Sequence, residues 1–138
     1  MSHDPQMAAR VWRGMRTLVL DRFDRRKEVT AALDMSFIRA KALRRLAAEP
    51  MTMRGLAAYL TIDAPYTTLV VDDLVRRDLV VREVHPDDRR QKIVTVTPEG
   101  EKAAAVAEAI LGEPPPAILD LDPADLATLD RIIATLTE

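Results

Sequence analysis

The feature that most limits the fold is a pair of short helical patterns separated by a tight turn. Thr52 is a suitable N-cap for a helix over residues 53–60, and Asp63 is a suitable N-cap for a second helix that runs to about Arg77. Pro65 falls in the first turn of the second helix, where its missing N–H has no helical partner to lose. Two short helices joined in this way predict a helix-turn-helix unit.

An extended pattern follows this unit directly. Residues 79–84 and 93–96 are rich in β-branched side chains, which favours strands. The intervening residues 85–92 contain proline, aspartate and several cations, a composition typical of a charged turn. The sequence therefore predicts a hairpin with a long charged tip, which together with the preceding helices makes a winged helix-turn-helix.

Further helical patterns lie on both sides of this unit. We predict these helices over residues 6–29, from Ser36 to about Ala48, over residues 98–111 and after Asp122-Pro123. The first helix and the last two carry more apolar surface than a small monomer easily hides, so a second copy of the chain is expected to cover it. The expected fold class is mainly α with a small β-hairpin wing (α+β).

Composition excludes several classes of protein. The 138 residues include no cysteine, which rules out disulfides, thiolate metal sites and thiol-based redox sensing. Aromatic residues are only 4%, which argues against an aromatic platform for single-stranded nucleic acid. No apolar run approaches the roughly 20 residues of a membrane-spanning helix, and the start lacks the pattern of a secretory signal. We therefore expect a soluble cytoplasmic protein without a membrane partner.

Catalytic and metal-binding patterns are also missing from the sequence. His3 and His85 lie far apart and have no neighbours at ligand spacing, so no metal site is expected. No Ser-His-acid order, glycine-rich phosphate loop or carboxylate pair with a plausible cleft is present. We expect a protein that is not an enzyme and that holds no cofactor.

The charge is distributed unevenly along the chain. Its net value is +2 over residues 1–35, +3 over residues 36–98 and -7 over residues 99–138, which gives the total of -2. Such asymmetry concerns partners rather than the fold. The first two thirds suit a polyanion, and the acidic end has to point away from it. The alternative is that the acidic residues merely cover solvated helix faces.

Two stretches resemble the MarR family of bacterial transcription regulators. Residues 60–82 resemble the turn, the recognition helix and the first wing strand of the family. Residues 87–100, which read Asp-Asp-Arg-Arg-Gln-Lys-Ile-Val-Thr-Val-Thr-Pro-Glu-Gly, resemble the wing and the opening of the next helix. Asp88 and Arg90 stand at the D-x-R pair of the family. The resemblance is strong over roughly residues 36–100.

The resemblance implies a single MarR-like domain over residues 1–138. Its winged helix-turn-helix DNA-binding lobe would span residues 36–98, with dimerisation helices in residues 1–35 and 99–138. Members of this family are homodimers that bind pseudo-palindromic operators in double-stranded DNA, with the recognition helix in the major groove and the wing in the minor groove. The implied function is a transcriptional regulator, in the first instance a repressor, released by a small aromatic or anionic effector. The alternative is a winged-helix module that mediates protein contacts and has lost specific DNA binding.

The wing carries the main expected DNA contacts. Arg90 is expected to enter a minor groove, where the potential is most negative, and Arg89 and Lys92 to neutralise phosphates. Asp88 is expected to orient an arginine, because phosphate repels a carboxylate. Further contacts are expected from Thr52 and Arg54 at the start of one helix and from Pro65, Tyr66, Thr68 and Leu69 at the start of the recognition helix.

The recognition helix departs from the family in its charge. Family members often carry Arg or Lys here, including at the position of Leu69, whereas this chain has neither from Asp63 to Val75. Bidentate reading of guanine by this helix is therefore not expected. Two alternatives are apolar contact with thymine methyl groups, and weak readout with most of the specificity in the wing and in DNA shape.

The resemblance also implies an effector crevice between the dimer helices and the DNA-binding lobe. Its expected lining residues are Trp12, Met15, Arg16, Met35 and Phe37. The alternative is that these side chains are ordinary core.

Overall fold

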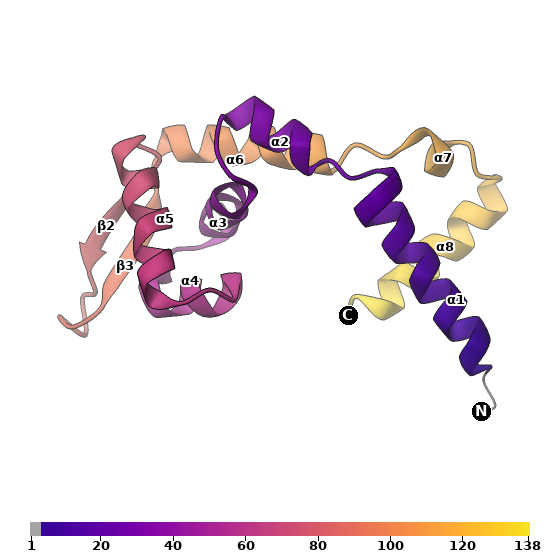
Figure 1. The fold of residues 1–138 in the computed structure, drawn as a ribbon, viewed down its shortest axis with the longest axis horizontal. Coiled ribbons are helices and arrows are strands. Elements are labelled where there is room, and N and C mark those ends of the chain that lie inside the picture. Colours follow the sequence, from indigo (N-terminus) through magenta and orange to yellow (C-terminus); the bar gives the residue numbers. More distant parts are fainter. Residues whose placement is uncertain (1–3) are drawn as a thin grey trace.

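The computed structural model describes residues 4–138, which form helices and one small sheet (Figure 1). The elements are α1 (Pro5–Arg16), η1 (Thr17–Arg22), α2 (Arg26–Leu33), α3 (Phe37–Ala48), β1 (Met51–Thr52), α4 (Met53–Leu60), α5 (Ala64–Arg76), β2 (Val80–Val84), β3 (Lys92–Val96), α6 (Pro98–Leu111), α7 (Pro116–Leu119) and α8 (Pro123–Leu136). A winged helix-turn-helix lobe lies at one end of the molecule, and α1 and α8 lie at the other. The long helix α6 runs between them (Figure 1).

Side-chain caps set the helix starts where the sequence predicts them. The hydroxyl oxygen of Thr52 accepts a hydrogen bond from the N–H of Gly55 at 3.0 Å and thereby begins α4. A carboxylate oxygen of Asp63 accepts one from the N–H of Tyr66 at 2.8 Å and begins α5. Each cap satisfies an amide that the first helical turn leaves unpaired. The two helices begin at the predicted residues, so the predicted helix-turn-helix is confirmed.

The sheet has three antiparallel strands in the order β1-β3-β2. The predicted hairpin is confirmed, with Val80 opposite Val96 and Val84 opposite Lys92. The two-residue strand β1 pairs with the other edge of β3, where Thr52 lies opposite Ile93. This pairing places the start of α4 directly beside the wing.

A close approach of backbones fixes the wing against α6. The hydroxyl oxygen of Thr97 accepts a hydrogen bond from the N–H of Gly100 at 3.0 Å, and the same hydroxyl donates to the carbonyl oxygen of Asp78 at 2.7 Å. A Cβ at Gly100 would overlap the carbonyl oxygen of Leu79. The Thr-Pro-Glu-Gly segment thus caps α6 and allows its first turn to lie against the chain that enters β2.

One hydrophobic core holds the winged-helix lobe together. Its largest fully buried side chains include Leu43, Leu46, Leu56 and Leu74. The core also takes in Val29 of α2 and two alanines of α6, Ala104 and Ala107. The packed body therefore extends on both sides beyond the predicted 36–98 lobe.

The prediction of one helix over residues 6–29 is wrong. The α-helix ends at Arg16, a π-helical segment follows, and the chain leaves helical geometry at Phe23 (φ -124°, ψ 38°) before α2 begins. Asp24 accepts hydrogen bonds from the backbone N–H and the guanidinium of Arg26, both at 2.9 Å, which stabilises the new start. Arg25 donates to the carbonyl oxygen of Glu113 at 3.1 Å. Apolar periodicity cannot reveal a contact between residues so far apart in sequence. The short helix α7 was also not predicted.

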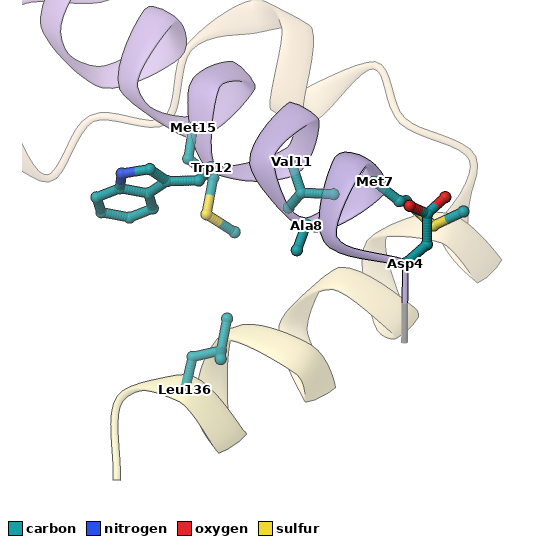
Figure 2. Close-up of a pocket in the computed structure, with 7 residues that line it drawn as sticks. All are labelled: Asp4, Met7, Ala8, Val11, Trp12, Met15 and Leu136. Carbon is teal, nitrogen blue, oxygen red and sulfur yellow. The ribbon is translucent and has the colours of Figure 1, made fainter. Parts of the chain in front are cut away.

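Helices α1 and α8 bury no residue of their own. Leu136 of α8 lines one open cavity together with apolar side chains of α1, among them Met15 and Trp12, and both Trp12 and Leu136 are 64% exposed (Figure 2). Among residues 4–138, no helix has both the length and the apolar character needed to cross a membrane.

Candidate nucleic-acid interface

The tip of the wing is folded around one carboxylate. Asp88 accepts hydrogen bonds from the backbone N–H of Arg90 at 3.0 Å and from its guanidinium at 3.1 Å, and a third from the side chain of Gln91 at 3.2 Å. These bonds from Arg90, first from its side chain and then from its backbone, lower the pKa of Asp88. The side chain of Arg90 is nevertheless 90% exposed, so the carboxylate fixes the direction of a guanidinium that points into solvent.

The wing and the start of α4 share a shallow depression. Its lining includes Thr52, Arg54, Arg90 and Lys92, which the pairing of β1 with β3 brings together. Arg89 lies at a neighbouring depression beside His85. Among the described residues, Arg54, Arg89 and Lys92 have no ion-pair partner. The wing therefore presents cationic side chains beside the N-terminus of α4. There the hydroxyl oxygen of Thr52 already accepts the N–H of Gly55.

The predicted contact residues of the recognition helix lie on its outer face. Pro65, Tyr66, Thr68 and Leu69 are all exposed, and Leu69 is exposed at 55%. The opposite face is buried through Thr67, Val70, Val71 and Leu74. The first two turns of α5 are thus accessible on one side, and their other side packs against the core of the lobe.

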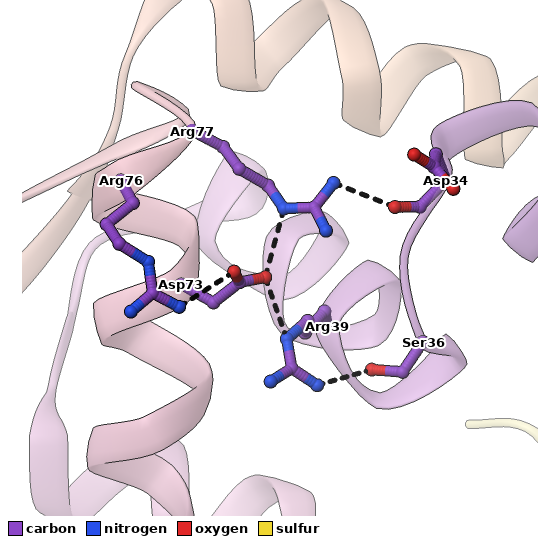
Figure 3. Close-up of polar contacts among 6 residues, drawn as sticks. All are labelled: Asp34, Ser36, Arg39, Asp73, Arg76 and Arg77. Carbon is purple, nitrogen blue, oxygen red and sulfur yellow. Dashed lines mark hydrogen bonds and ion pairs between the residues drawn. The ribbon is translucent and has the colours of Figure 1, made fainter.

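The cations close to α5 are paired with its own carboxylates. Arg82 of β2 lies 2.6 Å from Asp72. Asp73 accepts from Arg39 at 2.9 Å, from Arg76 at 3.0 Å and from Arg77 at 3.0 Å (Figure 3). The hydrogen bond from Arg76 is the main cause that lowers the pKa of Asp73, and the charges of Arg77 and Arg39 add to it.

Two of the three guanidiniums around Asp73, those of Arg39 and Arg77, tie the recognition helix to the rest of the lobe (Figure 3). Arg39 also donates to the hydroxyl of Ser36 at 2.8 Å, at the start of α3. Arg77 donates to the carbonyl oxygen of Asp34 at 2.8 Å, in the turn between α2 and α3. Sequence reasoning missed this cluster. The spacing of Asp73 to Arg76 and Arg77 was a usable signal, since residues three and four apart share a helix face, whereas Arg39 gave none.

The five predicted effector residues are not brought together. Trp12, Met15 and Arg16 line an open apolar cavity of about 450 Å³ with Val19, Leu20 and Ile133. Met35 is buried in the core of the lobe, and Phe37 packs against that core. The core interpretation therefore fits Met35 and Phe37, and it does not fit Trp12.

The histidine, aspartate and glutamate side chains of the described residues were predicted to form no metal site. Within residues 4–138 no group of three or more histidine, aspartate and glutamate side chains is arranged to hold a metal ion. His3 lies outside the described residues.

The wing, the helix-turn-helix and the long flanking helices together define a winged helix-turn-helix protein. The sequence model of the MarR family matches residues 33–91, and no curated protein matches the chain. The resemblance seen in the sequence is thereby confirmed over residues 33–91, and the fold of the chain is the winged helix-turn-helix.

Solved structures with this fold cover almost the whole chain. Wild-type MarR (apo form) from E. coli has a TM-score of 0.74 at 19% identity and covers 100% of this chain and 99% of its own. A mutant MarR from E. coli complexed with operator DNA has a TM-score of 0.66 at 20% identity, with coverage of 99% and 100%. The MepR–DNA complex from S. aureus has a TM-score of 0.61 at 19% identity, with coverage of 95% and 98%.

Proposed function

We propose that the protein is a transcriptional regulator, acting as a repressor, that binds a pseudo-palindromic operator in double-stranded DNA as a homodimer. The observation that carries the proposal is the juxtaposition of an exposed cationic wing with an exposed recognition helix on one face of the lobe. Arg54, Arg90 and Lys92 gather at the wing, and the outer face of α5 stands free beside them. A wing and a helix presented together suit adjacent grooves of a duplex.

The solved relatives add independent support. A MarR mutant and MepR, which share this fold along nearly the whole chain, have structures with DNA bound. In this chain the cations of the wing would neutralise phosphates. The side chain of Arg90, which is 90% exposed, would enter the narrow minor groove.

The apolar surfaces of α1 and α8 support the homodimer. Met7, Val11 and Trp12 of α1 are more than half exposed, and no residue of either helix is buried. A patch of this kind is a normal mark of an interaction site. A second copy is the occupant that the charges favour, since α1 carries three arginines and no acid, whereas residues 120–138 carry five acids and one arginine. In a C2 pair, α1 of one copy can lie against α8 of the other.

Release by a small aromatic or anionic effector is part of the proposal. It is supported by the cavity that Trp12 and Met15 line, since the cation of Arg16 lines it as well. An effector would act by binding one spacing of the two lobes better than the other. The function places the protein in the cytoplasm, where bacterial DNA lies, and includes no enzymatic activity.

The decisive experiment selects duplexes from a random-sequence pool with the full chain and then measures the affinity for the selected duplex as salt is varied. We expect an enriched pseudo-palindrome with half-sites about one helical turn apart, and an affinity that falls as salt rises. If no duplex is enriched and no salt-dependent binding is found, the DNA-binding function is wrong. The protein-contact module, which the absence of Arg and Lys from Asp63 to Val75 favours, then takes its place.

A further inference from the structure

The outer face of α5 is apolar in the half of the helix that reads bases. Thr67, Val70, Val71 and Leu74 are buried, so the residues that point most directly away from the core are Pro65, Leu69, Asp72 and Arg76. In helix-turn-helix proteins the N-terminal residues of the recognition helix contact the base edges. At those positions the outermost side chains of this chain are a proline and a leucine.

No cation of α5 accompanies them. Arg76 is seven residues beyond Leu69, about 10 Å further along the helix axis. Asp72, one turn after Leu69, forms an ion pair of 2.6 Å with Arg82 of β2. The guanidinium of Arg82 is therefore already paired with a carboxylate. The leucine therefore stands on a surface that offers neither a guanidinium to a guanine nor an amide to an adenine.

The chemistry of the major groove selects the partner of such a side chain. Guanine, adenine and cytosine present nitrogen and oxygen atoms there, and thymine alone also presents a methyl group. Leu69 laid against a polar edge would remove water from that edge and return no hydrogen bond, which is unfavourable. Laid against a methyl group, it buries two apolar surfaces.

We infer that Leu69 is a specificity-determining residue that contacts the C5-methyl group of a thymine in each half-site and so selects an A·T pair at that position. The inference rests on the proposed function, because it requires α5 to enter a major groove. Leu69 suits this role since it is 55% exposed and contributes nothing to the core, while the buried face of α5 holds it in place. The hydroxyl of Thr68, also exposed, lies one residue away and is able to bond a base edge or a phosphate beside it.

The test removes the methyl group without changing the base pairing. The operator selected by the full chain is prepared with deoxyuridine in place of each thymidine in turn, and binding of the wild-type chain and of Leu69→Ala is compared. For the wild type we expect one thymine in each half-site whose replacement weakens binding about fourfold, the effect of one buried methyl group. For Leu69→Ala that sensitivity should vanish, although the variant binds more weakly overall.

The comparison also separates the inference from the function on which it rests. Val81→Ala is the matched control, since Val81 is an exposed apolar side chain of the wing (41% exposed) and should keep the full sensitivity to deoxyuridine. Equal sensitivity of wild type and Leu69→Ala, or no sensitivity at any thymine, overturns the inference and leaves the regulator intact. Failure to enrich any duplex overturns both.

A specificity change gives the inference a second readout. Leu69→Arg places a guanidinium at the same position and should select duplexes in which guanine replaces that thymine, because arginine bonds the O6 and N7 atoms of guanine. If selection with Leu69→Arg returns the wild-type sequence, Leu69 does not read this base.

Discussion

The cluster around Asp73 gives the most quantitative test of how the recognition helix is held. In Asp73→Asn the three guanidiniums of Arg39, Arg76 and Arg77 lose their common anion. The partners differ in exposure, with side chains that are 18% exposed for Arg39, 37% for Arg77 and 69% for Arg76. The part-buried bond to Arg39 is worth about 1.5 kcal/mol, and the two more exposed pairs contribute about 0.5 kcal/mol or less each.

We therefore expect Asp73→Asn to lower the free energy of unfolding by about 2 kcal/mol and the Tm by about 6 °C, measured by calorimetry at fixed protein concentration. Arg39→Met should account for most of this loss. Arg76→Ala is the matched control and should cost about 0.5 kcal/mol or less, because water screens that pair even though its hydrogen bond does most to lower the pKa of Asp73.

The same substitution predicts a pH dependence. The pKa of Asp73 is lower in the folded chain than in the unfolded chain, so its contribution to stability is complete above about pH 4 and is lost as pH falls through the lowered value. The difference in Tm between wild type and Asp73→Asn should therefore shrink below about pH 4. A difference that stays constant down to pH 2, or an Arg76→Ala variant as unstable as Arg39→Met, would refute this reasoning.

Three further predictions concern the dimer, the phosphate contacts and the wing. Ile133→Glu introduces a charge on the apolar face of α8 and should convert a dimer to a monomer in sedimentation equilibrium. Val81→Glu, on the wing, should leave the measured mass unchanged. A wild-type monomer would contradict the proposed homodimer. Arg89→Ala and Lys92→Ala should each reduce the slope of log affinity against log salt by about 1 for every phosphate contact removed, and unchanged slopes would exclude both residues from the interface. Gly100→Ala should lower the free energy of unfolding in urea by about 1–3 kcal/mol, because its Cβ overlaps the backbone that enters β2; an unchanged midpoint would show that α6 can move away at no cost.

Local signals in the sequence were sufficient for most of the fold. Thr52 and Asp63 each cap the helix that they were predicted to begin, because a cap depends only on its own residue and on the amides two or three positions later. The β-branched runs likewise predicted both strands of the hairpin. These features lie within a few residues of the signal that predicts them.

The features that sequence reasoning missed depend on residues far apart in the chain. Arg25 reaches the carbonyl oxygen of Glu113, and Arg39 reaches Asp73, and neither contact leaves a periodic trace. Periodicity also identifies an apolar face without saying what covers it. The resemblance, for its part, grouped Trp12 with Met35 in one crevice, although the first is 64% exposed and the second is buried.

The central claim is that the wing and α5 form a DNA-binding face, and the most direct test is the affinity of Arg90→Ala for the selected operator. The side chain is 90% exposed, so its loss should leave the fold and the dimer intact. With two wings on one operator, we expect affinity to fall at least about 30-fold. Arg131→Ala removes the same charge from α8, at the opposite end of the molecule, and should bind as the wild type does (Figure 1). Equal affinities of Arg90→Ala and wild type would contradict the account.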